Sequence, residues 1–215
     1  MNTSDFIDKV THFSEENELV HTYVNVDNKA KAYDRFLKRL FWVDELNIYM
    51  TGWLGELYNY TNGVDLINYY IVPYNNYYNQ KKFAYDDFCR GWITNHKNEI
   101  LAGFYSFMTD DSSLIGFLGQ LRDTQGNHFI AYSKTKKRLN DVDVIFSSVF
   151  SLYDYIIDSL SKNENLNFEK PLAFWRERDN ELDQAYQNNE IMEYKMKHLF
   201  KLESDNYRLN KKIEE

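Results

Sequence analysis

Three strand-like segments lie within residues 100–133, ILAGFYSFMTDDSSLIGFLGQLRDTQGNHFIAYS. They run from Ile100 to Met108, from Leu114 to Arg122 and from His128 to Ser133. The intervening stretches, DDSS at 110–113 and DTQGN at 123–127, are rich in residues that form tight turns. Short turns keep consecutive strands adjacent, so this part of the chain predicts an antiparallel meander.

Helical patterns flank the meander on both sides. The expected helices cover the first 20 residues, with Ser4 or Thr3 as the cap, then residues 28–42, 53–61, 84–98 and 147–160. Residues 64–83 predict a short strand or irregular segment followed by a loop. A connected antiparallel sheet needs one face covered by helices. We therefore expect an α+β fold with an antiparallel sheet covered by helices on one face and a long helical C-terminal extension.

The extension begins after Pro171. Apolar and polar residues recur there at alternating steps of three and four, at Met192, Lys195, Leu199, Leu202, Asn206, Leu209 and Ile213. This heptad pattern predicts homodimerisation through Leu199, Leu202, Asn206, Leu209 and Ile213, with Asn206 setting the register. The alternative is a single amphipathic helix that lies on its own domain. The expected division is a domain at 1–165 and a helical tail at 166–215.

The charge and the aromatic content favour a binding protein. The formal net charge is −8 and the pI is about 5.2, which disfavours direct nucleic-acid binding and suits a basic protein partner. Acidity also simply keeps proteins soluble. The 18 Tyr and 15 Phe supply half-polar contact surface. An AT-rich genome would also enrich Tyr, Asn, Lys and Ile without selection for binding.

The compartment is expected to be the cytoplasm. Cys89 is the single cysteine, so no internal disulfide can form. No run of 18 apolar residues occurs, and acidic residues occupy the N-terminal segment where a signal peptide would be basic and then apolar. No association with a membrane is expected.

Residue patterns typical of catalysis are missing. The histidines are scattered, at His12, His21, His96, His128 and His198, without a metal-binding spacing, and no phosphate-binding glycine motif occurs. The carboxylate pairs Asp86–Asp87 and Asp110–Asp111 lie at a helix start and in a turn, where Asp is common for backbone reasons. We expect no enzyme activity, no cofactor and no metal; an enzyme with a dispersed acidic site is the alternative.

Three segments in chain order resemble the SMI1/KNR4 (SUKH) superfamily over about residues 30–160. The helix WLGELYNY at 53–60 runs into Thr61-Asn62-Gly63, as in the helix that ends in Asn-Gly in that family. FYSFMTDD at 104–111, GFL at 116–118 and DTQGN at 123–127 resemble the central sheet of the family. IFSSVFSLYDYI at 145–156 is similar to its closing helix.

The resemblance implies a domain whose bacterial members act mostly as immunity proteins, which bind and neutralise toxins that are often nucleases. On this basis we expect a non-catalytic, protein-binding immunity protein. The expected partner-binding residues are Asp86, Asp87, Asp110, Asp111, Tyr77 and Tyr78. A phage or mobile-element protein that blocks a host defence component is the alternative with the same scaffold.

Overall fold

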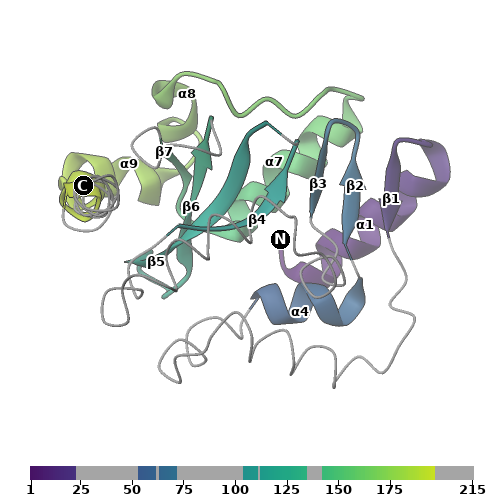
Figure 1. The fold of residues 1–215 in the computed structure, drawn as a ribbon, viewed down its shortest axis with the longest axis horizontal. Coiled ribbons are helices and arrows are strands. Elements are labelled where there is room, and N and C mark those ends of the chain that lie inside the picture. Colours follow the sequence, from purple (N-terminus) through teal and green to yellow (C-terminus); the bar gives the residue numbers. More distant parts are fainter. Residues whose placement is uncertain (23–52, 62, 72–103, 111, 135–141, 197–215) are drawn as a thin grey trace, which may run out of the picture. The chain divides into compact units, whose positions relative to one another are not determined.

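The computed structural model describes residues 1–22, 53–61, 63–71, 104–110, 112–134 and 142–196. These residues form an α+β fold in which the strand pairings are antiparallel, as predicted, and strands pair in chain order from β1 to β7 (Figure 1). The chain divides into two compact units. The first unit is Met1–Phe88, Met108–Asp110 and Phe150–Leu166, and the second is Cys89–Phe107, Asp111–Val149 and Asn167–Glu215.

The first unit combines short strands with longer helices. Its elements are α1 (Thr3–Glu16), β1 (Val20–Thr22), α4 (Trp53–Tyr60), β2 (Val64–Leu66), β3 (Tyr69–Ile71), the end of β4 (Phe104–Thr109) and nearly all of α7 (Val149–Ser161). Val20 pairs with Leu66, Leu66 with Tyr69, and Ile71 with Met108. The predicted helices at the N-terminus, at 53–61 and at 147–160 are therefore confirmed.

The N-cap of helix α1 lies one residue before Thr3 and two before Ser4, the two caps that we expected. Asn2, and not Ser4 or Thr3, is the N-cap, because its side-chain oxygen accepts the Asp5 N–H at 2.8 Å. The apolar face is buried, and the Phe6 ring stacks on Tyr153 of α7 with centroids 4.0 Å apart. The buried face of α1 therefore packs against α7, a helix that is far away in the sequence.

Residues 64–71 after α4 form a hairpin of two short strands, where we expected one short strand or an irregular segment. Gly63 follows the helix with φ of 124°, a conformation that other residues rarely adopt. Strands β2 and β3 then pair across a turn at Ile67 and Asn68, where Ile67 has φ of 55°. Asn68 bonds both the N–H and the carbonyl of Leu166 at 2.9 Å. A β-branched residue at positive φ gives no turn signal in the sequence.

The second unit contains the predicted meander and one strand that was not predicted. Its described strands are the start of β4, β5 (Leu114–Arg122), β6 (His128–Ser133) and β7 (Val142–Phe146). Across the β6–β7 pair, Ala131 lies opposite Val144 and Ile130 lies opposite Phe146. Ile145 of β7 is therefore an extra residue that forms a β-bulge. Tyr132 and Asp143 lie directly opposite each other on the paired strands.

The helical pattern after Pro171 is interrupted and forms three short helices in the described residues. They are α8 (Leu172–Arg176), α9 (Asn180–Gln187) and α10 (Glu190–Tyr194), and α8 and α9 lie beside β7 (Figure 1). Asp179 caps α9, and Asn189 at φ of 62° separates α9 from α10. The three helices bury Trp175, Leu182, Ile191 and Tyr194.

The helices expected at 28–42 and 84–98 lie outside the described residues, as do the loop expected after Ile71 and the heptad positions after Met196.

Candidate functional site

Of the predicted contact residues, Asp110 alone falls in the described part of the chain. It directly follows β4 in the first unit and is half-buried. Asp86, Asp87, Asp111, Tyr77 and Tyr78 lie outside the described residues, and so do the dimerisation residues Leu199, Leu202, Asn206, Leu209 and Ile213. Two other features of the described residues, one in each unit, are candidates for a binding surface.

The first feature is the solvent face of α1 and the turn after it. We call it the acidic surface; it consists of Asp5, Asp8, Glu15, Glu16 and Glu18, all of them exposed. The apolar face of the helix is buried, so helical spacing directs Asp5, Asp8, Glu15 and Glu16 to the opposite side, and Glu18 follows in the turn. Lys9 is the one Lys or Arg in residues 1–22. The side chains of α1 therefore expose negative charge that its own sequence barely offsets.

The rest of the first unit does not offset this charge within its described residues. These carry eleven acidic side chains and two basic ones: Asp5, Asp8, Glu15, Glu16, Glu18, Glu56, Asp65, Asp110, Asp154, Asp158 and Glu164 against Lys9 and Lys162. Lys162 pairs with Asp158 at 2.7 Å, and the N-terminal ammonium lies 3.6 Å from Asp154. Negative potential of this kind attracts basic macromolecules and speeds their encounter.

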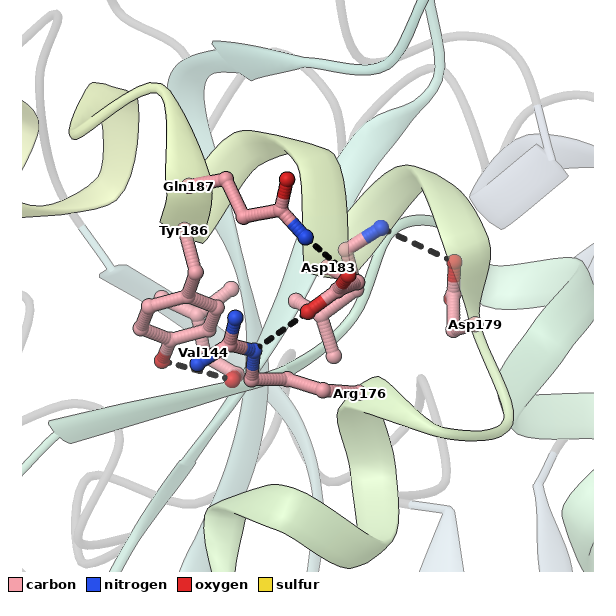
Figure 2. Close-up of polar contacts among 7 residues, drawn as sticks. Val144, Arg176, Asp179, Asp183, Tyr186 and Gln187 are labelled. Carbon is pink, nitrogen blue, oxygen red and sulfur yellow. Dashed lines mark hydrogen bonds and ion pairs between the residues drawn. The ribbon is translucent and has the colours of Figure 1, made fainter.

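In the second unit a polar network joins α8 and α9 to β7 and to the residue after it, and Figure 2 shows the part that includes Val144 of β7. The buried Asp179 carboxylate accepts the N–H and the hydroxyl of Ser147, both at 2.8 Å, and the Leu182 N–H at 3.0 Å. Arg176 and Gln187 donate to Asp183, as Figure 2 shows. Asp183 therefore links α9 to α8 through Arg176, and Asp179 links α9 to the residue after β7.

Two titratable groups lie where α9 and α10 meet β7. The Tyr186 hydroxyl donates to the Val144 carbonyl at 2.9 Å (Figure 2). Burial, together with the negative Asp143, raises the pKa of Tyr186 well above its usual value. Burial also lowers the pKa of Lys195, although Asp143, 3.8 Å from its ammonium, opposes that effect. Both groups bind their neighbours most strongly in the protonated form.

The second candidate feature is a pocket of about 420 Å³ in the second unit, which we call the aromatic pocket. Its floor is formed by the buried side chains of Tyr132, Ile145, Phe168 and Trp175. Its rim is formed by Lys134, Asp143, Glu169, Lys170 and Leu172, all of them exposed. The Phe168 ring stacks between Tyr132 and Trp175, with centroid distances of 6.3 Å on each side.

The polar atoms of the pocket floor are bonded within the protein. The Tyr132 hydroxyl donates to Glu169 at 3.3 Å, and the Trp175 indole N–H donates to the Lys170 carbonyl at 3.2 Å. Lys134 pairs with the same Glu169 oxygen at 3.1 Å. The polar atoms of the floor are therefore engaged within the protein, while charge of both signs surrounds the opening.

The buried His128 has a structural role, because both of its ring nitrogens lie within hydrogen-bonding distance of β5 residues. Its Nδ1 lies 2.8 Å from the Leu118 carbonyl and its Nε2 lies 2.9 Å from Arg122 Nη2. A carbonyl only accepts and a guanidinium only donates, so Nδ1 carries the proton and Nε2 accepts. Both ring nitrogens are therefore engaged in holding the β5–β6 turn.

Within the described ranges, no group of three or more His, Cys, Asp or Glu side chains is arranged to hold a metal ion. None of the helices in the same ranges has the length and apolar character to cross a bilayer.

Comparison of the chain with protein families, with curated proteins and with solved structures found no match.

Sequence reasoning did not find either candidate feature. The five carboxylates of the acidic surface are visible in the sequence, and their position opposite the apolar residues of α1 was a usable signal. The aromatic pocket gave no such signal, because its residues come from β6, β7, the segment before α8 and α8 itself. Only folding brings them together.

Proposed function

We propose that this chain is a non-catalytic, cytoplasmic binding module that recognises a basic protein through the acidic surface of its first unit. The role that fits such a module is that of an immunity protein, which occludes a toxin, and a nuclease is one example of a basic toxin. The proposal rests on one observation: the described residues of the first unit carry eleven acidic side chains and only two lysines.

Electrostatic and structural considerations support this proposal. Complementary charge raises the association rate and disfavours wrong partners, which suits an inhibitor that must act on its target quickly. The described carboxylates of the second unit that are buried or half-buried, such as Asp179 and Asp183, are bonded to nearby side chains and backbone. The resemblance of residues 53–63, 104–127 and 145–156 to SUKH proteins points to the same role.

The test is affinity capture from cells of the source, followed by identification of the captured protein. We expect a basic protein whose toxicity is relieved when this chain is co-expressed with it. A host defence component in its place would favour the counter-defence role. Capture of no protein, or of an acidic protein, would contradict the proposal.

A charge-reversal variant then locates the surface. Asp8→Lys combined with Glu15→Lys and Glu16→Lys is expected to slow association with the captured protein at least tenfold. The matched control reverses three exposed acids of the second unit, Glu177, Glu190 and Glu193, and so changes the net charge equally. If both triple variants slow association to the same extent, net charge and not the acidic surface governs binding.

A further inference from the structure

Two basic side chains of the second unit form no ion pair with a described carboxylate. Lys170 and Arg178 are both exposed, and both lie over the ring of Phe174. The Lys170 ammonium is 5.7 Å and the Arg178 guanidinium carbon 4.2 Å from the ring centroid. We call Lys170, Phe174 and Arg178 the cationic cluster. The other described Lys and Arg side chains of this unit are paired with oxygen acceptors: Lys134 with Glu169, Arg176 with Asp183, Lys195 with Asp143, and Arg122 with the Gly126 carbonyl.

A shortage of acids does not explain why these two cations are left over. The described residues of the second unit carry nine acidic and six basic side chains. Glu169 pairs with Lys134, and the buried Asp179 accepts backbone and hydroxyl hydrogen bonds. Glu177 is exposed at the C-cap of α8 and forms no ion pair with a described residue. The N–H donors of the cationic cluster are therefore not used by any described carboxylate.

The buried Trp175 fixes the backbone at both ends of the cluster. Its indole N–H donates to the Lys170 carbonyl at 3.2 Å, and its own carbonyl accepts the Arg178 N–H at 3.1 Å. The Phe174 ring packs edge-on against the indole, with centroids 4.9 Å apart and planes at 88°. Trp175 is 1% exposed, so it holds the ring and the two attachment points in place before any ligand binds.

The arrangement of the cluster fits a ligand with two negative charges. Since both cations lie over one ring, they are no more than about 10 Å apart, the sum of their two distances from its centroid. A contact with a ring face needs no lone-pair acceptor, so the N–H groups of both cations remain available as donors. An anion at the cluster would offset the repulsion between the two like charges and accept charge-assisted hydrogen bonds from both.

A peptide suits this cluster better than a nucleic acid does. Nucleic-acid binding needs a series of Lys and Arg contacts along successive phosphates. The cluster supplies two cations, and the described residues of its unit carry more acids than bases, which would repel an extended polyanion. A phosphorylated residue or two adjacent acidic residues in a peptide present about two negative charges at a single place.

We propose that the cationic cluster binds a segment of a protein that carries two adjacent negative charges, on a phosphorylated residue or on a pair of acidic residues. Basic side chains recognise phosphorylated and acidic motifs in this way in other peptide-binding proteins. The inference does not depend on the proposed function, because the acidic surface lies in the first unit and attracts the opposite charge.

The direct test titrates capped peptides into the ¹⁵N-labelled full chain at low salt. Ac-Gly-pSer-Gly-NH₂ and Ac-Glu-Glu-NH₂ are expected to give saturable amide shifts at Lys170, Phe174 and Arg178, and the tighter of the two identifies the preferred source of charge. Ac-Gly-Ser-Gly-NH₂ and Ac-Lys-Lys-NH₂ should give none. Absence of saturable shifts with both anionic peptides, or tighter binding of a single-stranded octathymidylate than of either one, would overturn the inference.

A double variant tests the two cations. Lys170→Gln combined with Arg178→Gln is expected to weaken peptide binding about tenfold, the loss of two exposed ion pairs. The matched control combines Lys9→Gln with Lys162→Gln, which removes the same charge from exposed lysines of the first unit and should leave peptide binding unchanged. If both double variants weaken binding equally, net charge and not the cluster attracts the peptide, and the inference is wrong.

A third variant tests the ring. Phe174→Leu keeps both charges and is expected to weaken binding about threefold, because the cations lose the contact that holds them together. Thermal unfolding reports whether the variant keeps its fold, and wild-type affinity in the folded variant would disprove the role of the ring. The double variant at Lys170 and Arg178 changes exposed side chains only, so it tests the site whatever the stability of Phe174→Leu. Failure of this test leaves capture of a basic partner through the acidic surface unaffected.

Discussion

At the scale of single residues, Asp179 connects three parts of the second unit. Its two oxygens accept hydrogen bonds from the Ser147 N–H, the Ser147 hydroxyl and the Leu182 N–H, and it is 7% exposed. One oxygen holds the residue that follows β7 and the other caps α9. A buried carboxylate with several donors contributes more than an exposed one, because each donor would otherwise lose a partner.

Replacing Asp179 with Asn is therefore expected to lower the free energy of unfolding by about 2–3 kcal/mol, since one acceptor becomes a donor and the remaining bonds lose charge. Urea unfolding followed by far-UV circular dichroism measures this change. Asp158→Asn, which removes one exposed ion pair on α7, serves as the control and should cost under about 1 kcal/mol. Equal losses in the two variants would contradict the role given to Asp179.

Tyr186 is expected to make the stability of the protein depend on pH in the alkaline range. Burial and Asp143 raise the pKa of this hydroxyl in the folded chain. A raised pKa means that the stabilisation is complete below the unfolded value, near 10, and is lost as the pH rises further. Tyr186→Phe should cost about 1 kcal/mol at pH 7. The difference in unfolding free energy between wild type and variant should shrink above pH 10; a constant difference from pH 8 to 11 would disprove the assignment.

At the scale of elements, the turn between β5 and β6 is set by local chemistry. Asp123 accepts hydrogen bonds from the N–H groups of Gln125 and Asn127, and Gly126 has φ of 86°. Arg122 Nη1 closes the turn on the Gly126 carbonyl at 2.6 Å. A Cβ at Gly126 would meet no atom within 4 Å, so the requirement for glycine comes from the backbone conformation alone.

Gly126→Ala is accordingly expected to destabilise the protein by about 1 kcal/mol without a change in fold. Gly126→Asn should cost less, because Asn tolerates positive φ better than Ala. Thermal unfolding of the three proteins provides the comparison. The opposite order, with Asn the more harmful, would show that space and not backbone conformation limits this position.

This turn also explains why the meander could be predicted while other elements could not. The DTQGN sequence identifies both the turn and the strands on either side of it. The β2–β3 hairpin turns at Ile67 and Asn68, and its conformation is supported by Leu166, which lies 98 residues from Asn68. Strand β7 is five residues long, and its bulge at Ile145 interrupts any alternation. Such features depend on contacts that are distant in sequence.

At the scale of the whole molecule, the formal charge of −8 is unevenly distributed. The described residues of the first unit hold most of the excess of acidic side chains, whereas the described acids of the second unit are accompanied by six basic residues: Arg122, Lys134, Lys170, Arg176, Arg178 and Lys195. The net charge could be read from the sequence. Its concentration on one unit could not, because that unit is assembled from three separate stretches of the chain.

We expect the association rate with the captured basic partner to fall about tenfold or more between 50 and 500 mM salt, because screening shortens the reach of the acidic surface. The dissociation rate should change much less. Stopped-flow or surface binding kinetics at several salt concentrations measure both rates. An association rate that is independent of salt would contradict electrostatic steering.

The C-terminal segment makes a separate prediction about oligomeric state. Met192 in α10 and Met196 after the helix are 47% and 64% exposed, whereas Lys195, which caps α10, lies against Asp143. The heptad pattern continues through residues 199–213 in the sequence. Deletion of residues 197–215, which keeps α10 intact, is expected to convert a dimer to a monomer in light scattering. An unchanged mass would favour the alternative of an amphipathic helix on its own domain.

The side chains beside β7 have one more consequence. Among the described strands β7 is the last in the pairing order, and a terminal strand offers unpaired peptide groups on which another chain can extend the sheet. The Tyr186 hydroxyl donates a hydrogen bond to the Val144 carbonyl, and the Asp179 carboxylate accepts one from the N–H of Ser147. Helices α8 and α9 thus block strand addition at this edge. A chain that ended before residue 171 would expose it, and we would expect such a fragment to aggregate.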